Sequence, residues 1–234
     1  MVVSWFSAGV SSFIATYLMK DEVDKIIYID IDDQHEDSLR FVKDCEKLLG
    51  KPIEILKSRY GSVENVIKQF KYVNGPYGAR CTSILKKRVR KEWEDAHKGE
   101  DITYIWGYDL NEKHRQERLV EAMPNFEHRF PLIEKELTKE DVHGMCWRLG
   151  VERPKMYELG YPNNNCIGCV KGGKGYWNKI RIDFPAVFER MAKLEREIGA
   201  TCIKETYLDE LDPKAGREQK VILDDCGISC QMNI

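Results

Sequence analysis

The chain of 234 residues has no apolar stretch long enough to cross a membrane, which takes roughly 18 residues in a row. Its start, Met1-Val2-Val3, enters a strand pattern at once, without the basic and apolar segments of a secretory signal. Internal repeats and low-complexity segments are missing as well. We therefore expect a cytoplasmic globular protein that has no membrane as a partner.

Neither sign of charge is in excess, since 37 Lys and Arg residues and 39 Asp and Glu residues give a net charge of −2 at pH 7. This balance does not indicate a nucleic acid as partner, although a nucleic-acid substrate stays open. The cysteines, in contrast, are numerous: there are eight. In a chain that is not exported, they indicate thiol chemistry or metal ligands rather than a disulfide framework.

The order of apolar segments predicts an α/β fold. Short apolar runs at residues 25–31, 52–56 and 101–107 are typical of buried strands. Residues 38–50 carry apolar side chains at helical spacing and end at Gly50. Strands alternating with helices imply right-handed crossovers and a parallel sheet.

A turn of small residues joins the first strand to a helix. The first turn of a helix offers unpaired N–H groups and the positive end of the helix dipole, and small residues let a ligand approach them. This combination predicts a phosphate or sulfate site, and a serine-capped turn without a ligand is the plainer alternative. The residues expected to bind are Ser7, Ala8, Gly9, Val10, Ser11 and Ser12.

Polar residues follow the later strands. Asp30 and Asp32 come at the end of the second strand, and Gly107 ends the fourth. Ligands of parallel sheets bind at this edge, so we expect these residues near the ligand, with a solvated acidic loop as the alternative. Arg115 and Arg118 lie one helical turn apart and could bind phosphate or sulfate together.

Five of the cysteines belong to suggestive patterns. Cys166 and Cys169 form a Cys-x-x-Cys pair in a loop rich in Gly and Asn, which fits a metal site, an iron–sulfur site or a redox dithiol. Cys81 opens a cationic helix, a setting that lowers a thiol pKa, so it is a candidate metal ligand or reactive thiol. Cys226 and Cys230 could carry a thiol into a site or complete a metal site. Core positions are expected for the other three, Cys45, Cys146 and Cys202.

In this order the motifs resemble the PP-loop superfamily, and within it the phosphoadenosine-phosphosulfate (PAPS) reductase-like family. Residues 7–12 resemble its SGGxDS pyrophosphate loop, with Ala8 in place of a glycine and Ser11 in place of the aspartate. The resemblance implies a three-layer, Rossmann-like parallel sheet of the adenine nucleotide alpha-hydrolase-like type. It further implies a nucleotide-binding domain at residues 1–150 and a helical, cysteine-bearing extension at residues 151–234, packed on the same domain.

The cysteines extend this resemblance. Cys81, Cys166 and Cys169 resemble ligand positions of the iron–sulfur members, which have a second adjacent cysteine where this chain has Thr82. Residues 225–228 resemble the tail that carries the nucleophilic cysteine of the reductases. The resemblance therefore implies a [4Fe–4S] cluster on these three cysteines, with Cys230 or the other tail cysteine as the fourth ligand.

The resemblance implies an enzyme that binds an adenine nucleotide, and it leaves the reaction open. One reaction is ATP-dependent sulfur transfer with Mg²⁺. Another is reduction of PAPS or adenylyl sulfate, in which Cys226 would form an S-sulfocysteine that releases sulfite. A third alternative is an inactive nucleotide-binding module with a structural zinc ion.

Catalytic roles are implied for Cys226, Cys230 and Arg115. The partners consistent with the resemblance are an adenine nucleotide and a thiol reductant or sulfur-donor protein. A homodimer stays open.

Overall fold

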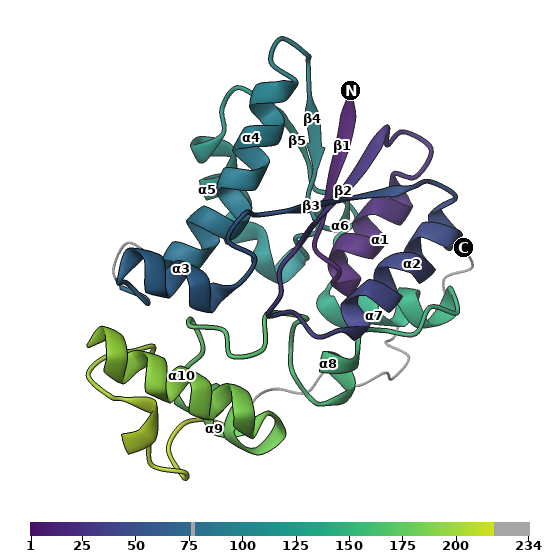
Figure 1. Cartoon of the computed structure of the whole chain (residues 1–234). Coiled ribbons are helices and arrows are strands. Elements are labelled where there is room, and N and C mark those ends of the chain that lie inside the picture. Colours follow the sequence, from purple (N-terminus) through teal and green to yellow (C-terminus); the bar gives the residue numbers. More distant parts are fainter. Residues whose placement is uncertain (76–77, 218–234) are drawn as a thin grey trace.

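The computed structural model describes residues 1–75 and 78–217, which form a parallel sheet flanked by helices (Figure 1). Five strands lie in the order β3-β2-β1-β4-β5, with β1 in the centre. In the register, Val3 lies opposite Lys25 on one side and Tyr104 on the other. The strands are β1 (Val2–Phe6), β2 (Lys25–Asp30), β3 (Ile53–Lys57), β4 (Thr103–Ile105) and β5 (Glu127–Arg129). The predicted α/β fold with a parallel sheet is confirmed.

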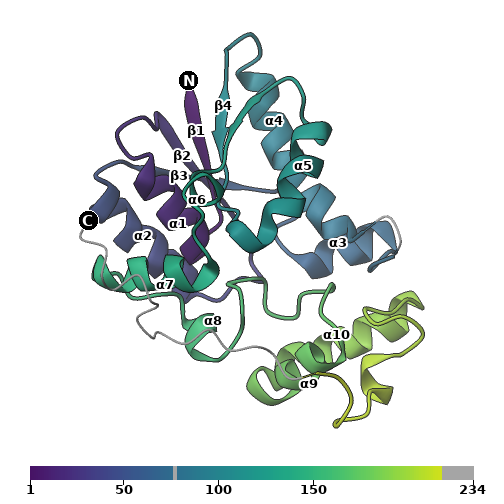
Figure 2. The ribbon, with the colours of Figure 1, turned by 180° about the vertical axis from the view of Figure 1, so that it is seen from behind.

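Helices cover both faces of the sheet, with α1, α2 and α7 on one face and α4 and α5 on the other (Figures 1 and 2). The helices are α1 (Val10–Leu18), α2 (Asp37–Leu49), α3 (Val63–Phe70), α4 (Arg88–Ala96), α5 (Lys113–Ala122), α6 (Pro131–Glu134), α7 (Lys139–Arg148), α8 (Lys155–Glu158), α9 (Lys174–Asp183) and α10 (Pro185–Ile198). Short π and 3-10 segments are η1 (Thr82–Lys87), η2 (Leu110–Glu112) and η3 (Leu208–Glu210). Within residues 1–75 and 78–217, no helix is long and apolar enough to span a membrane.

The two faces of the sheet bury alternate side chains of each strand. Phe6 and Ile26 pack in a core with α1 and α2, whereas Val3, Ile27 and Tyr104 pack in a second core with α4. This alternation follows from the two-residue period of a strand. Because both faces are covered, the strands read as continuous apolar runs in the sequence.

The end of α2 and the start of the helix near Cys81 can both be compared with the sequence-based prediction. Gly50 adopts the left-handed conformation, with φ +64°, and ends α2 as the sequence predicts. The helix that Cys81 was expected to open passes directly after Cys81 into the π-helix η1 and continues as α4. Short π-helical segments occur preferentially at functional sites, because they displace side chains from the regular helical spacing.

A third core lies beyond the carboxyl edge of the sheet, where α9 and α10 are placed (Figures 1 and 2). It combines Ile31, Val66 and Leu85 from the first half of the chain with Trp177 and Met191 from the second half. This core takes side chains from both sides of residue 150. The division into domains at that residue stays a prediction.

Candidate functional site

The loop between β1 and α1 is closed by its own serine hydroxyls. The Ser12 hydroxyl donates to the carbonyl oxygen of Gly9 at 2.8 Å. It accepts the backbone N–H of Ser7 at 3.1 Å and the Ser7 hydroxyl at 3.0 Å. Ser12 therefore shapes the loop, while the N–H groups of the first turn of α1 remain the groups suited to an anion.

Two backbone positions of the loop are sterically demanding. Ala8 is buried in the left-handed conformation, with φ +56°, which turns the chain sharply before α1. Gly107, just after β4, lies so close to α1 that a Cβ atom there would be 2.6 Å from the backbone nitrogen of Ser12. Only glycine allows this approach. The segment just after β4 therefore packs directly against the start of α1.

Two residues from the second half of the chain also support the loop. The Asn164 side-chain amide donates to the carbonyl oxygen of Ala8 at 2.7 Å and to the Ser38 hydroxyl at 3.0 Å. Tyr157 is buried, and burial raises its pKa to about 12, although backbone hydrogen bonds from Val10 and Asn164 act in the opposite direction. Sequence reasoning did not single out either residue, because nothing local distinguishes Asn164 from its asparagine neighbours.

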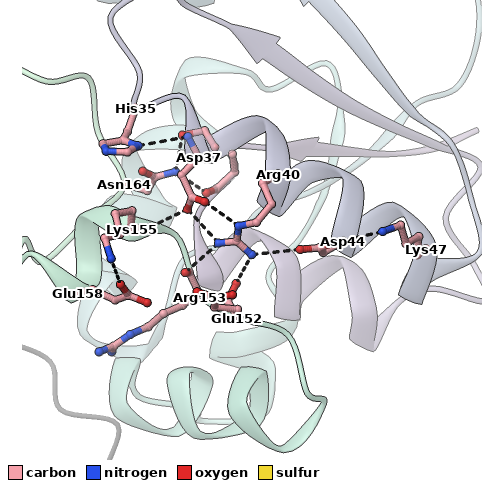
Figure 3. Close-up of polar contacts among 12 residues, drawn as sticks. His35, Asp37, Arg40, Asp44, Lys47, Glu152, Arg153, Lys155, Glu158 and Asn164 are labelled. Atoms are coloured by element: carbon pink, nitrogen blue, oxygen red, sulfur yellow. Dashed lines mark hydrogen bonds and ion pairs between the residues drawn. The ribbon is translucent and has the colours of Figure 1, made fainter.

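A polar cluster joins α2 to the segment that carries these supports (Figure 3). Arg40 donates to the Asp37 carboxylate at 2.6 and 2.9 Å and to the carbonyl oxygens of Glu152 and Arg153 at 2.9 and 3.1 Å. Asp37 also accepts the backbone N–H of Lys155 at 2.8 Å. Hydrogen bonding to Arg40 holds the pKa of Asp37 below its usual value. The segment before Asn164 is thereby fixed against α2.

The acidic residues at the end of β2 and just after it have two different roles. Lys57 of β3 pairs with Asp30 at 3.4 Å and with Asp32 at 2.5 Å, so these expected site carboxylates lie together at the carboxyl edge. Asp33 acts structurally instead. Its side chain accepts the first backbone N–H of α3 at 2.6 Å, and its carbonyl oxygen accepts the N–H of Ile167 at 2.7 Å. Asp33 thus fixes the Cys-x-x-Cys loop against the sheet edge.

A cavity of about 390 Å³ is lined by side chains of the third core, among them Ile31, Val63 and Leu85. Cys81, Cys166 and Cys169 all line it, together with the cationic side chains of Lys86 and Lys171. The three cysteines that the sequence pointed to as ligands therefore face one space.

The cavity and the loop between β1 and α1 lie on two sides of one short segment. Asn163 and Asn165 line the cavity, while Asn164 between them donates to the carbonyl oxygen of Ala8 in that loop. None of residues 7–12 lines the cavity itself.

Burial disfavours the thiolate form of two of the cavity cysteines. Burial raises the pKa of Cys166 to about 12 and raises that of Cys81 as well, although the positive charges of Lys86 and Lys171 oppose the shift at Cys81. The expectation that the helix start and its cations lower the pKa of Cys81 is wrong, because desolvation outweighs both. Buried thiols of this kind are poor nucleophiles, whereas metal binding would deprotonate them.

Within residues 1–75 and 78–217, no three Cys, His, Asp or Glu side chains are arranged to hold a metal ion. An iron–sulfur cluster or a zinc ion at Cys81, Cys166 and Cys169 therefore stays a prediction from the sequence.

The remaining expected site residues lie elsewhere. Arg115 and Arg118 are exposed on α5, and neither lines the cavity. Arg115 lies 4.4 Å from the ring centre of Tyr108 and pairs with Glu112. Their binding roles, like those of the loop residues, stay predictions. Cys226 and Cys230 lie outside the described residues.

Comparison with known proteins gives a consistent result. The model of the phosphoadenosine phosphosulfate reductase domain matches residues 1–173. An uncharacterized protein of Methanocaldococcus jannaschii is 24% identical over 203 residues, which are 82% of this chain and 41% of that protein. The chain thus spans about two fifths of the length of this curated relative.

A solved structure extends the comparison to the fold. The crystal structure of PAPS reductase from Candida auris, in a phosphate complex, is similar with a TM-score of 0.51 at 13% identity. The match covers 70% of this chain and 80% of that one. With the family match over most of its length, the chain belongs to the PAPS reductase-like family of the PP-loop superfamily.

Proposed function

We propose that this protein is an enzyme that binds ATP at residues 7–12 and transfers sulfur to an activated substrate. One observation carries the proposal: Asn164 donates a hydrogen bond to Ala8 in the loop of residues 7–12, while Asn163 and Asn165 line the three-cysteine cavity. A nucleotide site and a sulfur-rich site on two sides of one short segment suit a reaction that couples nucleotide cleavage to sulfur chemistry.

The nucleotide would lie with its phosphates against the start of α1. That helix has no acidic residue in its first turn, so nothing there opposes the charge of the phosphates. Asp30 and Asp32 are placed at the same edge and could hold Mg²⁺ in exchange for Lys57.

The chemistry proceeds in two displacements. An oxygen of the substrate attacks the α-phosphorus of ATP, a new P–O bond forms, the bond to the β-phosphate oxygen breaks, and pyrophosphate leaves. Sulfur then attacks the activated carbon and AMP leaves. The sulfur would come either from an iron–sulfur cluster in the cavity, which can supply sulfide, or from a cysteine persulfide loaded by a sulfur-donor protein.

If the sulfur comes from a persulfide, the two tail cysteines can complete the transfer without a cluster. The terminal sulfur on Cys226 attacks the activated carbon, and the thiolate of Cys230 then attacks the sulfur of Cys226. The thiolated product leaves, and the disulfide that remains is reduced by a thiol donor.

Sulfonucleotide reduction is the second candidate, and the family match favours it. The Cys226 thiolate would attack the sulfate sulfur of PAPS or adenylyl sulfate, an S–S bond would form, and the S–O bond to the phosphate would break. A thiol donor would then attack Cys226 and release sulfite.

Turnover of the anaerobically purified chain separates these reactions. With ATP, a sulfur donor and an acceptor substrate we expect pyrophosphate and AMP, and without acceptor we expect neither. With PAPS or adenylyl sulfate, sulfite would identify the reductase. A Cys226→Ser variant that still produced sulfite would exclude the reductase mechanism. Nucleotide binding with neither product would leave only a binding module, and bound zinc without iron would identify the third alternative.

A further inference from the structure

We propose that residues 57–91 carry a surface that binds single-stranded nucleic acid beside the three-cysteine cavity. Binding at this surface does not depend on the proposed function. A role of the bound strand as the sulfur acceptor would rest on that function, so the two are tested separately.

Charge is distributed unevenly along the chain. Residues 57–91 contain ten Lys and Arg residues and one acidic residue, Glu64, which gives this segment a charge of +9. The rest of the chain therefore carries −11, since the whole chain has −2. A local excess of this size attracts a polyanion even though the charge balance of the whole chain does not indicate one.

Half of these ten cations have no carboxylate beside them. The other half form ion pairs with Asp30 and Asp32, with Glu64, and with the acidic residues of α4. Exposed cations that form no ion pair within residues 1–75 and 78–217 are Arg59, Lys71, Arg80, Lys86 and Lys87. Their charge is therefore available to a partner with phosphate groups.

Two of these cations lie over aromatic rings. The Arg59 guanidinium lies 5.0 Å from the ring centre of Tyr60, and the Arg80 guanidinium lies 5.0 Å from that of Phe70. The Tyr60 and Phe70 rings are themselves 5.7 Å apart, centre to centre. These four side chains form one continuous set, the arginine–aromatic row. Nucleobases stack on aromatic rings and on guanidinium planes, whereas an acidic protein would need only the charges, so the row favours a nucleic acid.

The arginine–aromatic row joins two surface hollows. Arg59 and Tyr60 line one hollow of about 410 Å³, and Phe70 and Arg80 line a second of about 430 Å³. A strand can place successive bases in neighbouring hollows, whereas a free nucleotide would occupy only one. Neither hollow is lined by residues 7–12, so the surface is distinct from the predicted nucleotide loop.

The second hollow lies beside the three-cysteine cavity. Arg80 and Ser83 line the hollow, and Cys81 and Thr82 between them line the cavity. In both views α3 and α4, which flank this segment, lie on the opposite side of the molecule from α2 and α7 (Figures 1 and 2). A strand bound along the row would therefore pass close to the cysteines.

The test is fluorescence anisotropy of labelled oligonucleotides of about 15 nucleotides, a length within the range of single-strand sites, titrated with the full chain. We expect single strands to bind and a duplex of the same sequence to bind more weakly, because its bases are not free to stack. Parallel titrations with RNA and DNA identify which kind of strand is preferred. ATP with Mg²⁺ should not displace the strand.

Two double variants separate charge from stacking. Arg59→Ala/Arg80→Ala should reduce the slope of log affinity against log salt by about 1.4, since each contact of a single strand contributes about 0.7. Arg59→Lys/Arg80→Lys keeps both charges and loses the guanidinium planes. We expect it to weaken binding by about fivefold or more, the smallest effect of losing one stacked base, at an unchanged salt slope.

Tyr60→Leu tests the aromatic ring, because leucine keeps the apolar contact with the third core and removes the stacking face. We expect binding to weaken by about 5- to 150-fold. The matched control Lys43→Ala/Lys135→Ala removes two exposed cations outside the segment and should leave affinity and salt slope unchanged, because distant charges are screened.

Four results would overturn the inference. They are no binding of a single strand at low salt, equal binding of the duplex, displacement of the strand by ATP, and an equal loss of affinity in the control. Binding that both Arg59→Lys/Arg80→Lys and Tyr60→Leu leave unchanged would likewise overturn it, and would indicate a site for an acidic protein instead. None of these results bears on ATP turnover, which decides the proposed function.

Discussion

Replacing Gly107 by alanine tests whether the loop before α1 binds the nucleotide. The added Cβ would lie 2.5 Å from the Cα and 2.6 Å from the backbone nitrogen of Ser12. Both are main-chain atoms, so no side-chain rotation relieves the clash and the start of α1 must move. Overpacking of this kind costs about 1–3 kcal/mol. If the bound loop bears that cost, the affinity for nucleotide falls by about 5- to 150-fold, since about 1.4 kcal/mol is a factor of ten.

The assay is calorimetric titration with ATP and Mg²⁺ and, separately, with adenylyl sulfate. Thermal unfolding of the nucleotide-free proteins would show how much the substitution lowers the stability of the free protein. Gly144→Ala is the matched control, because its Cβ would meet only the Arg148 side chain, at an ordinary 3.6 Å. Unchanged affinity in folded Gly107→Ala, for a nucleotide that binds the unmodified chain, would refute the placement of the phosphates at this loop.

Three further predictions concern the supports of the site. Asn164→Ala removes the hydrogen bond to the carbonyl oxygen of Ala8. We expect about 1–3 kcal/mol lower stability and a higher KM for nucleotide. An unchanged KM would contradict the supporting role of Asn164. Arg40→Ala should lower the free energy of unfolding in urea by about 1–2 kcal/mol, and Arg40→Lys should not restore it, because one ammonium group cannot reach Asp37 and both carbonyl groups. Burial lowers the pKa of His143 from 6.5 to about 3, so the unfolded chain gains a proton that the folded chain does not. Stability should therefore fall as the pH drops from about 6.5 toward 3, by up to about 1.4 kcal/mol per pH unit, and urea midpoints of His143→Leu should show a shallower dependence.

The sheet and its loop could be predicted because their signals are local. The runs at 25–31 and 52–56, with a helix that ends at Gly50 between them, define a parallel unit without any knowledge of distant contacts. The small residues before α1 are also adjacent in the sequence. Even so, the length of the fourth strand was overestimated, since residues 101–107 yield only β4 at Thr103–Ile105.

The rest of the site depends on contacts that no local pattern encodes. The direction of the pKa shift of Cys81 could not be predicted, because this side chain packs against the third core, which takes residues from both halves of the chain. The contacts of Arg40 could not be predicted either, because its partners Glu152 and Arg153 lie more than a hundred residues away in the sequence. Cys202 was correctly expected to be buried, but its neighbours were not foreseeable from its surroundings in the sequence.

The bond between Asn164 and Ala8 has a consequence for the order of folding. It joins residues 156 positions apart, so a loop made among the first residues of the chain is held by a side chain that is synthesised much later. Closing such long-range contacts slows folding, and here it delays the completed loop until the second half of the molecule has docked. Nucleotide affinity during refolding should accordingly appear last, as a signal that the molecule is fully assembled.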